Sequence, residues 1–380
     1  MARTRIIFLS KRNIWSPTGG LSHYAMARAL ETHVGDVDAL FTLERRRPSA
    51  IIERIQRVFS IPPKSSSSGT PIAASKMEAE RIERVLKERG GHDVIFAPMA
   101  ADLIAFLRTD KPIIYLSDAT FRLMNGYYDP DDCLEGTDAE EREEIERRAL
   151  GRADLVVLSS DWAARSVIDD YDVDPQKVRV FYAGPNLPSV PQYELSRPDL
   201  GGKIRLLMVG RDWRRKGGQI ALDTIRELVN RGHGAHLTIC GMVPPVEVDT
   251  ENVSVVPFLD KAQKHDLNRL IGLYRDSHFL LFPSRAECHG LALNEANALG
   301  LPVLGSATGG IPDYIRPGVN GYLFPVDSGA KAYANKIASL VSDPAQYYKL
   351  RDTARHEYER RLNWRVWGSQ MERETRRLLE

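Results

Sequence analysis

Short apolar runs recur along the chain, and most are followed by a more polar stretch in which apolar residues return every three or four positions. Short continuous runs suit strands that are buried on both faces, and the longer periodic stretches suit helices packed on them. The strands predicted in this way are residues 5–10, 93–97, 112–116, 153–159, 178–182, 204–209, 235–240, 253–256, 279–282 and 302–305. The predicted helices run through residues 23–30 and over 77–89, 138–150, 161–169 (with Asp161 as its cap), 219–231, 267–274, 291–299 and 345–380. Strands that alternate with helices predict an α/β fold with parallel sheets.

This pattern stops once in the middle of the chain, over residues 183–202, which hold four prolines. A proline-rich stretch without periodicity is typical of a linker between domains. We therefore predict a first domain at 1–185, a hinge at 186–203, a second domain at 204–360 and a C-terminal helix at 361–380.

The composition is that of a globular protein with ample material for cores, since 43% of the 380 residues are hydrophobic. The formal net charge is only +1. A balance this close to neutral argues against nucleic acid as a partner. Cys133, Cys240 and Cys288 lie far apart and form no CxxC pair, so neither a disulfide framework nor a zinc site is predicted.

Membrane signals are few. The apolar run at residues 6–9 is too short for a signal peptide, and no stretch of 18 apolar residues occurs. We therefore expect a cytoplasmic protein, either soluble or peripheral at the inner membrane face. Residues 44–60 have an apolar face flanked by arginines, which fits an ordinary helix packed on a core or an interfacial helix touching anionic lipid.

The most informative stretch is residues 284–312, in which Gly290 opens a short helix. A helix N-terminus points unpaired N–H groups at the preceding loop, a place that suits a diphosphate. Glu287 precedes this helix and Glu295 projects from its second turn. Carboxylates accept hydrogen bonds from vicinal hydroxyls, so one glutamate could take a hexose and the other a ribose. The stretch therefore suits a nucleotide-sugar.

Together with its frame, this pair of glutamates resembles a known signature. Glu287-x7-Glu295, with Phe-Pro-Ser at 282–284, Gly-Leu-Pro-Val at 300–303 and Gly-Gly-Ile-Pro at 309–312, is similar to the motif of family-4 (group 1) retaining glycosyltransferases. The resemblance implies the GT-B fold: two Rossmann-like domains facing across a cleft, with a C-terminal helix that crosses back to the first domain. It also implies transfer of a hexose from a nucleotide-diphosphate sugar to a hydroxyl acceptor (glycan, lipid or small molecule), with no cofactor and no metal.

Two further loops acquire roles through this resemblance. Residues 210–218 form a basic, glycine-bearing turn after a strand, and the family's pattern places the donor phosphates on Arg211 and Lys216. Gly19-Gly20 follows the first strand. This pair is either a plain tight turn or, as the resemblance favours, a turn whose backbone approaches the donor phosphates or the acceptor across the cleft.

The chain also departs from the family pattern. Ser117 stands where the family often has a histidine, while the following Asp118 matches, so Asp118 remains a candidate catalytic residue. His289 stands where an aromatic residue is more usual, and it either contacts the donor or simply packs. Asp313 replaces a glutamate, a change we expect to be structural. Cys288, beside a helix N-terminus, could have an unusually low pKa. The sequence offers no partner histidine and acid that would indicate a nucleophile.

The resemblance implies the following roles. Glu287 orients the donor sugar and Glu295 binds the ribose. Arg211, Lys216 and the helix N-terminus at Gly290 and Leu291 stabilise the departing diphosphate. The acceptor attacks on the leaving-group side, and no protein nucleophile is named.

Several alternatives remain at this point. The Asp-x-Asp spacing at residues 170–174 superficially offers a metal motif, but it ends in a proline turn, where aspartates are ordinary turn residues. A phosphorylase, a sugar-nucleotide epimerase or a non-catalytic nucleotide-sugar binding subunit would use the same cleft. A Rossmann dehydrogenase is disfavoured because no G-x-G-x-x-G follows either first strand.

Overall fold

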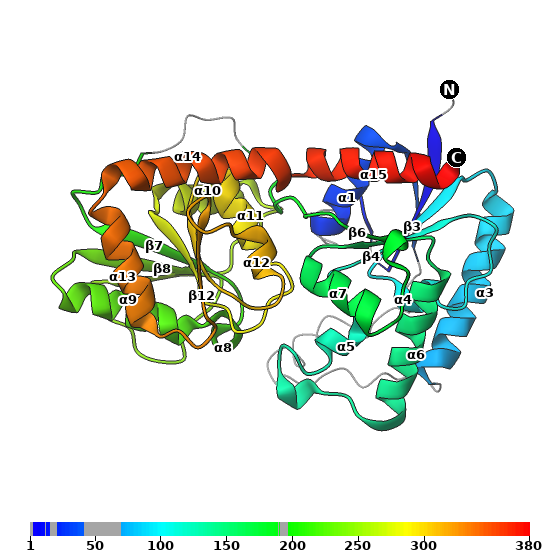
Figure 1. The fold of residues 1–380 in the computed structure, drawn as a ribbon, viewed down its shortest axis with the longest axis horizontal. Helices are drawn as coiled ribbons and strands as arrows, with labels where there is room; N and C mark the ends of the chain where they lie inside the picture. Colours follow the sequence, from blue (N-terminus) through cyan, green and yellow to red (C-terminus); the bar gives the residue numbers. More distant parts are fainter. Residues whose placement is uncertain (1–2, 12, 16–20, 42–69, 189, 191–196) are drawn as a thin grey trace.

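The computed structural model describes residues 3–11, 13–15, 21–41, 70–188, 190 and 197–380. Within these residues the chain forms two six-stranded parallel sheets that lie side by side, each with helices on both faces (Figure 1). The first sheet is built from residues 4–180 and the second from residues 204–324, so the chain passes from one to the other between them. This is the predicted α/β class.

The first sheet has the strand order β2-β1-β3-β4-β5-β6. Its strands are β1 (Thr4–Ser10), β2 (Gly35–Phe41), β3 (Val94–Pro98), β4 (Ile113–Ser117), β5 (Leu155–Leu158) and β6 (Val178–Val180). Alternate residues of each strand enter different cores, as the pleat requires. Ile7 packs with the helices on one face, whereas Phe8 packs with those on the other.

One face of this sheet is covered mainly by α3 (Pro71–Arg89), α4 (Ala101–Ile104), α6 (Gly136–Arg152) and α7 (Asp161–Asp169). The other face is covered by α1 (Leu21–His33) and by the last helix of the chain, α15 (Trp364–Leu379). A short helix, α5 (Phe121–Met124), follows β4. The first domain therefore completes its core with residues from the far end of the sequence.

The second sheet has the order β12-β11-β10-β7-β8-β9. Its strands are β7 (Ile204–Val209), β8 (Ala235–Cys240), β9 (Val253–Val256), β10 (Phe279–Phe282), β11 (Val303–Ser306) and β12 (Gly321–Phe324). The helices are α8 (Trp213–Lys216), α9 (Gly218–Asn230), α10 (Lys264–Asp276), α11 (Leu291–Ala298), α12 (Ile311–Tyr314), α13 (Ala330–Val341) and α14 (Pro344–Arg361). Leu206 packs with α9 and α13, while the adjacent Leu207 packs with α10 and α11.

The C-terminal helices link the two domains (Figure 1). The helical stretch predicted at 345–380 is broken at residues 362–363, where Asn363 caps α15 by accepting a hydrogen bond from the Val366 amide at 3.0 Å. Trp367 of α15 is buried, and its ring forms a T-shaped pair with Phe96 of β3, at 6.1 Å between centroids. Arg179 of β6 also pairs with Glu374, at 2.9 Å. These contacts hold α15 on the first domain.

Some local predictions were wrong. The cap of α7 is Ser160, whose hydroxyl accepts from the Ala163 amide at 3.2 Å, and Asp161 is the first helical residue. Edge strand β2 was missed because its sequence, GDVDALF, carries two aspartates and leaves much of the strand partly exposed. Helix α13 was also missed. Among the described residues, no helix is long and apolar enough to cross a bilayer.

Candidate functional site

The loops after β7 and β10 meet at the side of the second domain that faces the first. Helix α8 follows β7 and ends at Lys216, because Gly217 takes the left-handed conformation at φ 74°. A side chain at Gly217 would overlap the carbonyl oxygen of Pro283, just after β10, so only glycine allows the two loops to approach this closely. The approach places the Lys216 ammonium 4.4 Å from the centroid of the Phe282 ring.

Lys216 and Arg215 converge on Glu287. The Glu287 carboxylate accepts a hydrogen bond from Lys216 Nζ and another from Arg215 Nη1, the latter at 3.2 Å. Arg215 also donates to the Ala286 carbonyl at 3.1 Å. Burial lowers the pKa of Lys216, although the Glu287 carboxylate opposes this effect. The result is a buried cluster of two cations and one carboxylate.

This cluster lies directly before helix α11. Gly290 precedes the helix at φ 75°, where a side chain would come within 2.8 Å of the Phe282 ring. The helix then begins at Leu291, as predicted. Its unpaired N–H groups and its positive dipole end add to the positive charge supplied by Lys216 and Arg215.

Glu295 lies inside the second domain, with only 1% of its surface exposed. Its carboxylate accepts a hydrogen bond from the Tyr274 hydroxyl at 3.0 Å and another from Lys261 Nζ. Sequence reasoning missed both partners, which belong to α10 and to the loop before it. The ribose role of Glu295 stays a prediction. It requires Lys261 or Tyr274 to release its hydrogen bond, so that a Glu295 oxygen can accept one from the ribose.

Asp118 and His289 meet from opposite domains. Asp118 follows β4, and its carboxylate lies 3.6 Å from His289 Nδ1. The His289 ring stacks on Tyr314 with centroids 5.6 Å apart, and it is 7% exposed. Neither ring nitrogen has a hydrogen-bond partner among the described residues. His289 therefore packs against Tyr314 while its nitrogens retain the capacity to bind a ligand.

Arg211 lies apart from this cluster. It is exposed, and its guanidinium sits 4.0 Å from the centroid of the Phe258 ring. The position beside Glu287 is taken by Arg215, to which the sequence assigned no role. No local signal separates the two arginines, because their placement depends on the turn of α8 and on the distant loop at Glu287.

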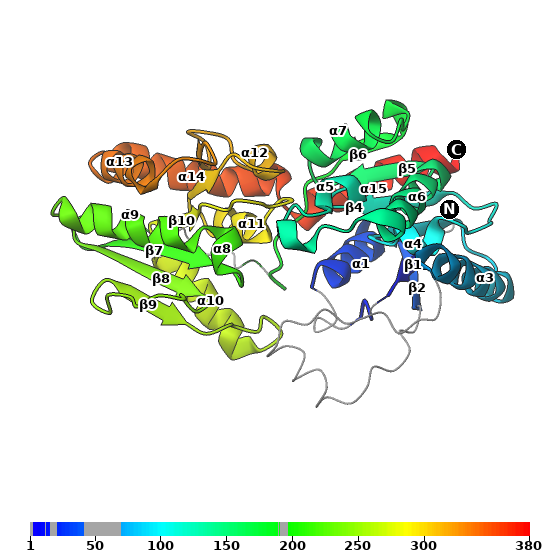
Figure 2. The ribbon, with the colours of Figure 1, turned by 90° about the horizontal axis from the view of Figure 1, so that it is seen from below.

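The first domain contributes two tyrosines that sequence reasoning also missed. The Tyr127 hydroxyl accepts a hydrogen bond from the Glu287 amide at 3.1 Å and bonds to the Thr308 hydroxyl at 3.2 Å. The Tyr128 ring lies 4.4 Å from the Arg215 guanidinium, and its hydroxyl donates to Cys288 Sγ at 3.1 Å. Both residues follow α5, which faces the second domain in Figures 1 and 2.

The structure describes two of the remaining candidates, Cys288 and Asp313. Burial raises the pKa of the Cys288 thiol to about 12, so the suggestion of an acidic cysteine is wrong. Asp313 accepts a hydrogen bond from the Asp161 amide at the start of α7, at 2.7 Å, and so ties the two domains together. Gly19, Gly20 and residues 44–60 lie outside the described residues.

The aspartates at 170–174 make turn and cap contacts. Asp170 accepts from the Ser166 hydroxyl at 2.6 Å, and Asp174 accepts from the Gln176 amide at 2.9 Å. Across the part of the chain that the structure describes, no group of three His, Cys, Asp or Glu side chains is placed to hold a metal ion.

Comparison with known proteins gives matches in both domains. Residues 203–343 match the family described as "Glycosyl transferases group 1", and residues 19–187 match "Glycosyltransferase Family 4". The D-inositol 3-phosphate glycosyltransferase of Corynebacterium glutamicum (strain R) is 26% identical over 280 residues, with 68% of this chain and 65% of the relative covered. The relative of that name from Arthrobacter sp. (strain FB24) is 26% identical, with 86% and 83% covered. The match thus spans just under two thirds of the Corynebacterium relative.

Solved structures share the fold. A glycosyltransferase from Rickettsia africae ESF-5 superimposes with a TM-score of 0.69 at 14% identity, with all of both chains covered. Sucrose-phosphate synthase from Thermosynechococcus elongatus gives 0.68 at 19%, covering 99% of each chain. Anabaena HepE in complex with UDP gives 0.66 at 16%, again covering 99% of each chain. These structures show that the chain has the GT-B fold. Because each domain matches its own glycosyltransferase family model, the protein belongs to the group 1, family-4 glycosyltransferases.

Proposed function

We propose that the protein transfers a hexose from a nucleotide-diphosphate sugar to a hydroxyl acceptor, with retention at the anomeric carbon and without a bound metal. The observation that carries this proposal is the buried cluster of Lys216, Arg215 and Glu287 beside the N-terminus of α11. It combines groups that bind a diphosphate with a carboxylate that can read sugar hydroxyls.

Donor binding would rearrange the cluster. In the structure, the Lys216 ammonium donates a hydrogen bond to Glu287. A diphosphate at the start of α11 carries more negative charge than one carboxylate, so it competes for this ammonium. Glu287 would retain Arg215 and accept hydrogen bonds from the hexose hydroxyls. Exposed Arg211 is free to reach the outer phosphate oxygens, in line with its predicted role.

The same groups would assist the chemistry. The bond between the anomeric carbon and the β-phosphate oxygen breaks, and negative charge grows on the diphosphate. Lys216, Arg215 and the α11 N-terminus stabilise that charge, which is the task that a metal ion performs in other enzymes. The acceptor oxygen bonds to the anomeric carbon on the face from which the diphosphate leaves. The acceptor's proton passes to a β-phosphate oxygen, so the configuration is retained.

Asp118 and His289 would complete the site from the two sides. Asp118 belongs to the first domain and His289 to the second, and the Asp118 carboxylate lies 3.6 Å from His289 Nδ1. We propose that the His289 nitrogens bond the donor and that Asp118 orients the imidazole or the hexose. The class of donor is supported by HepE, a protein of the same fold solved with UDP, with UDP and glucose, and with UDP-glucose.

The proposal is tested by a thermal-shift panel of UDP, GDP and ADP with their hexose derivatives, followed by transfer assays. A ligand present at 100 times its Kd should stabilise the protein by about 2.7 kcal/mol. We expect one nucleotide series to raise the melting temperature, turnover to persist in EDTA, and proton NMR to show the donor's anomeric configuration in the product. Absence of any nucleotide effect would overturn the donor site. Inversion or loss of turnover in EDTA would overturn the mechanism.

A further inference from the structure

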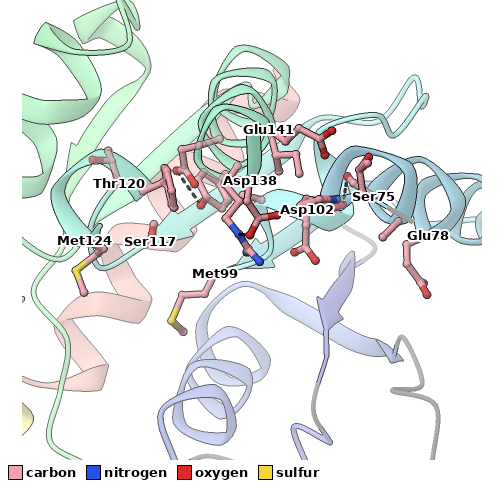
Figure 3. Close-up of a pocket in the computed structure, with 18 of the residues that line it drawn as sticks. Ser75, Glu78, Met99, Asp102, Ser117, Thr120, Met124, Asp138 and Glu141 are labelled. Atoms are coloured by element: carbon pink, nitrogen blue, oxygen red, sulfur yellow. Dashed lines mark hydrogen bonds and ion pairs between the residues drawn. The ribbon is translucent and has the colours of Figure 1, made fainter. Parts of the chain in front are cut away.

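The first domain contains a pocket of about 770 Å³ at the carboxyl end of its sheet. Its walls come from α3, α4 and α6 and from the residues that follow β4. Figure 3 shows Ser75 and Glu78 on one side of this pocket and Ser117 and Met124 on the other. A volume of this size fits a sugar-sized molecule.

One end of the pocket adjoins the candidate donor site. Met124 lines the pocket, and its sulfur lies 3.4 Å from Cys288 Sγ, next to Glu287. Ser117, at the same end, directly precedes Asp118. A molecule in the pocket would therefore approach the donor from the side of the first domain.

The described lining is acidic. It contains five carboxylates and two cations, and each cation is already paired with a carboxylate of the same pocket. Lys11 pairs with Asp102 at 2.5 Å, and Arg142 pairs with Asp138 at 3.7 Å. The carboxylates left over are Glu78, Glu141 and Glu146. Of these, Glu78 has a distant partner outside the pocket, Arg81 at 3.6 Å, and Glu141 accepts from the Ile72 amide at 3.0 Å.

Glu146 is the least compensated of the three. It belongs to α6, is only 7% exposed, and lines the pocket. Its hydrogen-bond partner is the Tyr115 hydroxyl at 3.2 Å, and among the described residues no cation pairs with it. Burial, followed by repulsion from Glu143 and Asp102, raises its pKa to about 7 in spite of the Tyr115 bond. A buried carboxylate at the wall of a cavity is strongly stabilised by a cation that enters the cavity.

We propose that this pocket binds the acceptor, and that the acceptor is a polyhydroxylated molecule carrying a protonated amine, an amino sugar or aminocyclitol, whose ammonium pairs with Glu146. The inference rests on the proposed function and deepens it. Glu78 and Glu141 would accept bonds from the hydroxyls. A phosphorylated acceptor, for example the inositol 3-phosphate that appears in the name of the Corynebacterium relative, would meet no unpaired cation in the described lining.

The test uses the full chain with a donor that it binds and acceptors in matched sets of three. One set is glucose, glucosamine and glucose 6-phosphate; the other is myo-inositol, an aminodeoxyinositol and inositol 3-phosphate. Acceptor-dependent release of the nucleoside diphosphate gives kcat/KM, and mass spectrometry identifies the product. We expect the amine of at least one set to exceed its neutral analogue about tenfold and the phosphate to be the poorest.

Variants then assign the preference to Glu146. We expect Glu146→Gln to lower kcat/KM for the amine to that of the neutral acceptor while donor binding is unchanged. Glu144→Gln is the matched control, because Glu144 lies on the same helix, pairs with Arg148 at 2.7 Å and does not line the pocket. Should Glu146→Gln not fold, Glu146→Asp keeps the charge and should keep a reduced amine preference.

The outcomes separate the two proposals. A preference for the phosphate or neutral member, or no stimulation by any amine while the donor still binds, overturns the acceptor inference alone. An amine preference that survives in Glu146→Gln also overturns it. Failure to bind any nucleotide-sugar removes the proposed function and this inference together.

Discussion

Replacing Lys216 by methionine would remove the ammonium that shares the Glu287 carboxylate with Arg215, while leaving a side chain of similar length over the Phe282 ring. The substitution therefore tests charge with little change in packing. It affects the free protein and the donor complex differently, so two magnitudes can be worked out.

In the free protein the cost should be moderate. Removing one partner of a buried ion pair costs about 3–5 kcal/mol when the other charge is left alone. Glu287 keeps Arg215 at 3.2 Å, so we expect roughly 1–2 kcal/mol of lost unfolding free energy, less than the fully orphaned case. For a domain of this size, that corresponds to a fall of about 2–8 °C in Tm.

In the donor complex, we expect the same substitution to weaken donor binding relative to wild type. A hydrogen bond to a charged group contributes about 1.5–3 kcal/mol, which is roughly 10- to 150-fold in Kd. Calorimetric titration with the nucleotide-sugar selected by the thermal-shift panel measures this directly. Arg214→Met is the matched control, because Arg214 is an exposed cation on the same short helix, and its Kd should stay within about twofold.

Two results would contradict this reasoning. Equal donor affinity in Lys216→Met and wild type would mean that Lys216 does not hold the diphosphate. Equal weakening in Lys216→Met and Arg214→Met would mean that only the overall positive charge of α8 matters.

Three further outcomes are expected, each measured by equilibrium unfolding. Gly217→Ala should lower the unfolding free energy by more than about 2 kcal/mol, because its Cβ would overlap Pro283. Gly232→Ala, at φ 83° with open space around it, should lower it by only about 1 kcal/mol. Equal losses in the two variants would contradict the close approach of Gly217 to Pro283. Because the folded-state pKa of Glu146 is about 7, above its ordinary 4.5, the folded protein holds this proton more tightly than the unfolded chain does, so wild type should lose up to about 3 kcal/mol of unfolding free energy relative to Glu146→Gln as pH rises from 5 to 8. Trp367→Ala should cost about 3–5 kcal/mol by opening the contact between α15 and the first sheet, whereas Leu379→Ala, at an exposed end of the same helix, should be nearly neutral.

Much of the fold could be predicted because its central strands are largely buried. Strands β7 and β10 have the predicted bounds, since a mostly apolar run between polar residues leaves little freedom in where a buried strand begins and ends. Strands β8 and β9 also have the predicted bounds, although β9 is an edge strand whose two middle residues are exposed. The start of α11 at Leu291 also follows from local sequence, because the positive φ of the preceding residue, Gly290, is one that glycine adopts far more readily than other residues. Edge strand β2 lacked such a run and was missed.

The candidate site could be predicted only in part. The sequence identified Glu287 and Lys216, which do meet, but it could not show that Arg215 rather than Arg211 stands beside them. It also gave no sign of Tyr127 and its bond to the Glu287 amide. These contacts join loops that are distant in sequence, and no local pattern encodes which side chains face each other there.

The sequence by itself thus determined the alternation of elements and the glycines that shape the loops around Lys216 and Glu287, because burial periodicity and allowed backbone angles are local properties. The tertiary structure decided which charges are compensated. Glu295 is neutralised by Lys261, whereas Glu146 faces the pocket without a described cation. Both are glutamates on helices, and only their three-dimensional surroundings distinguish a carboxylate paired with a cation from one that is not.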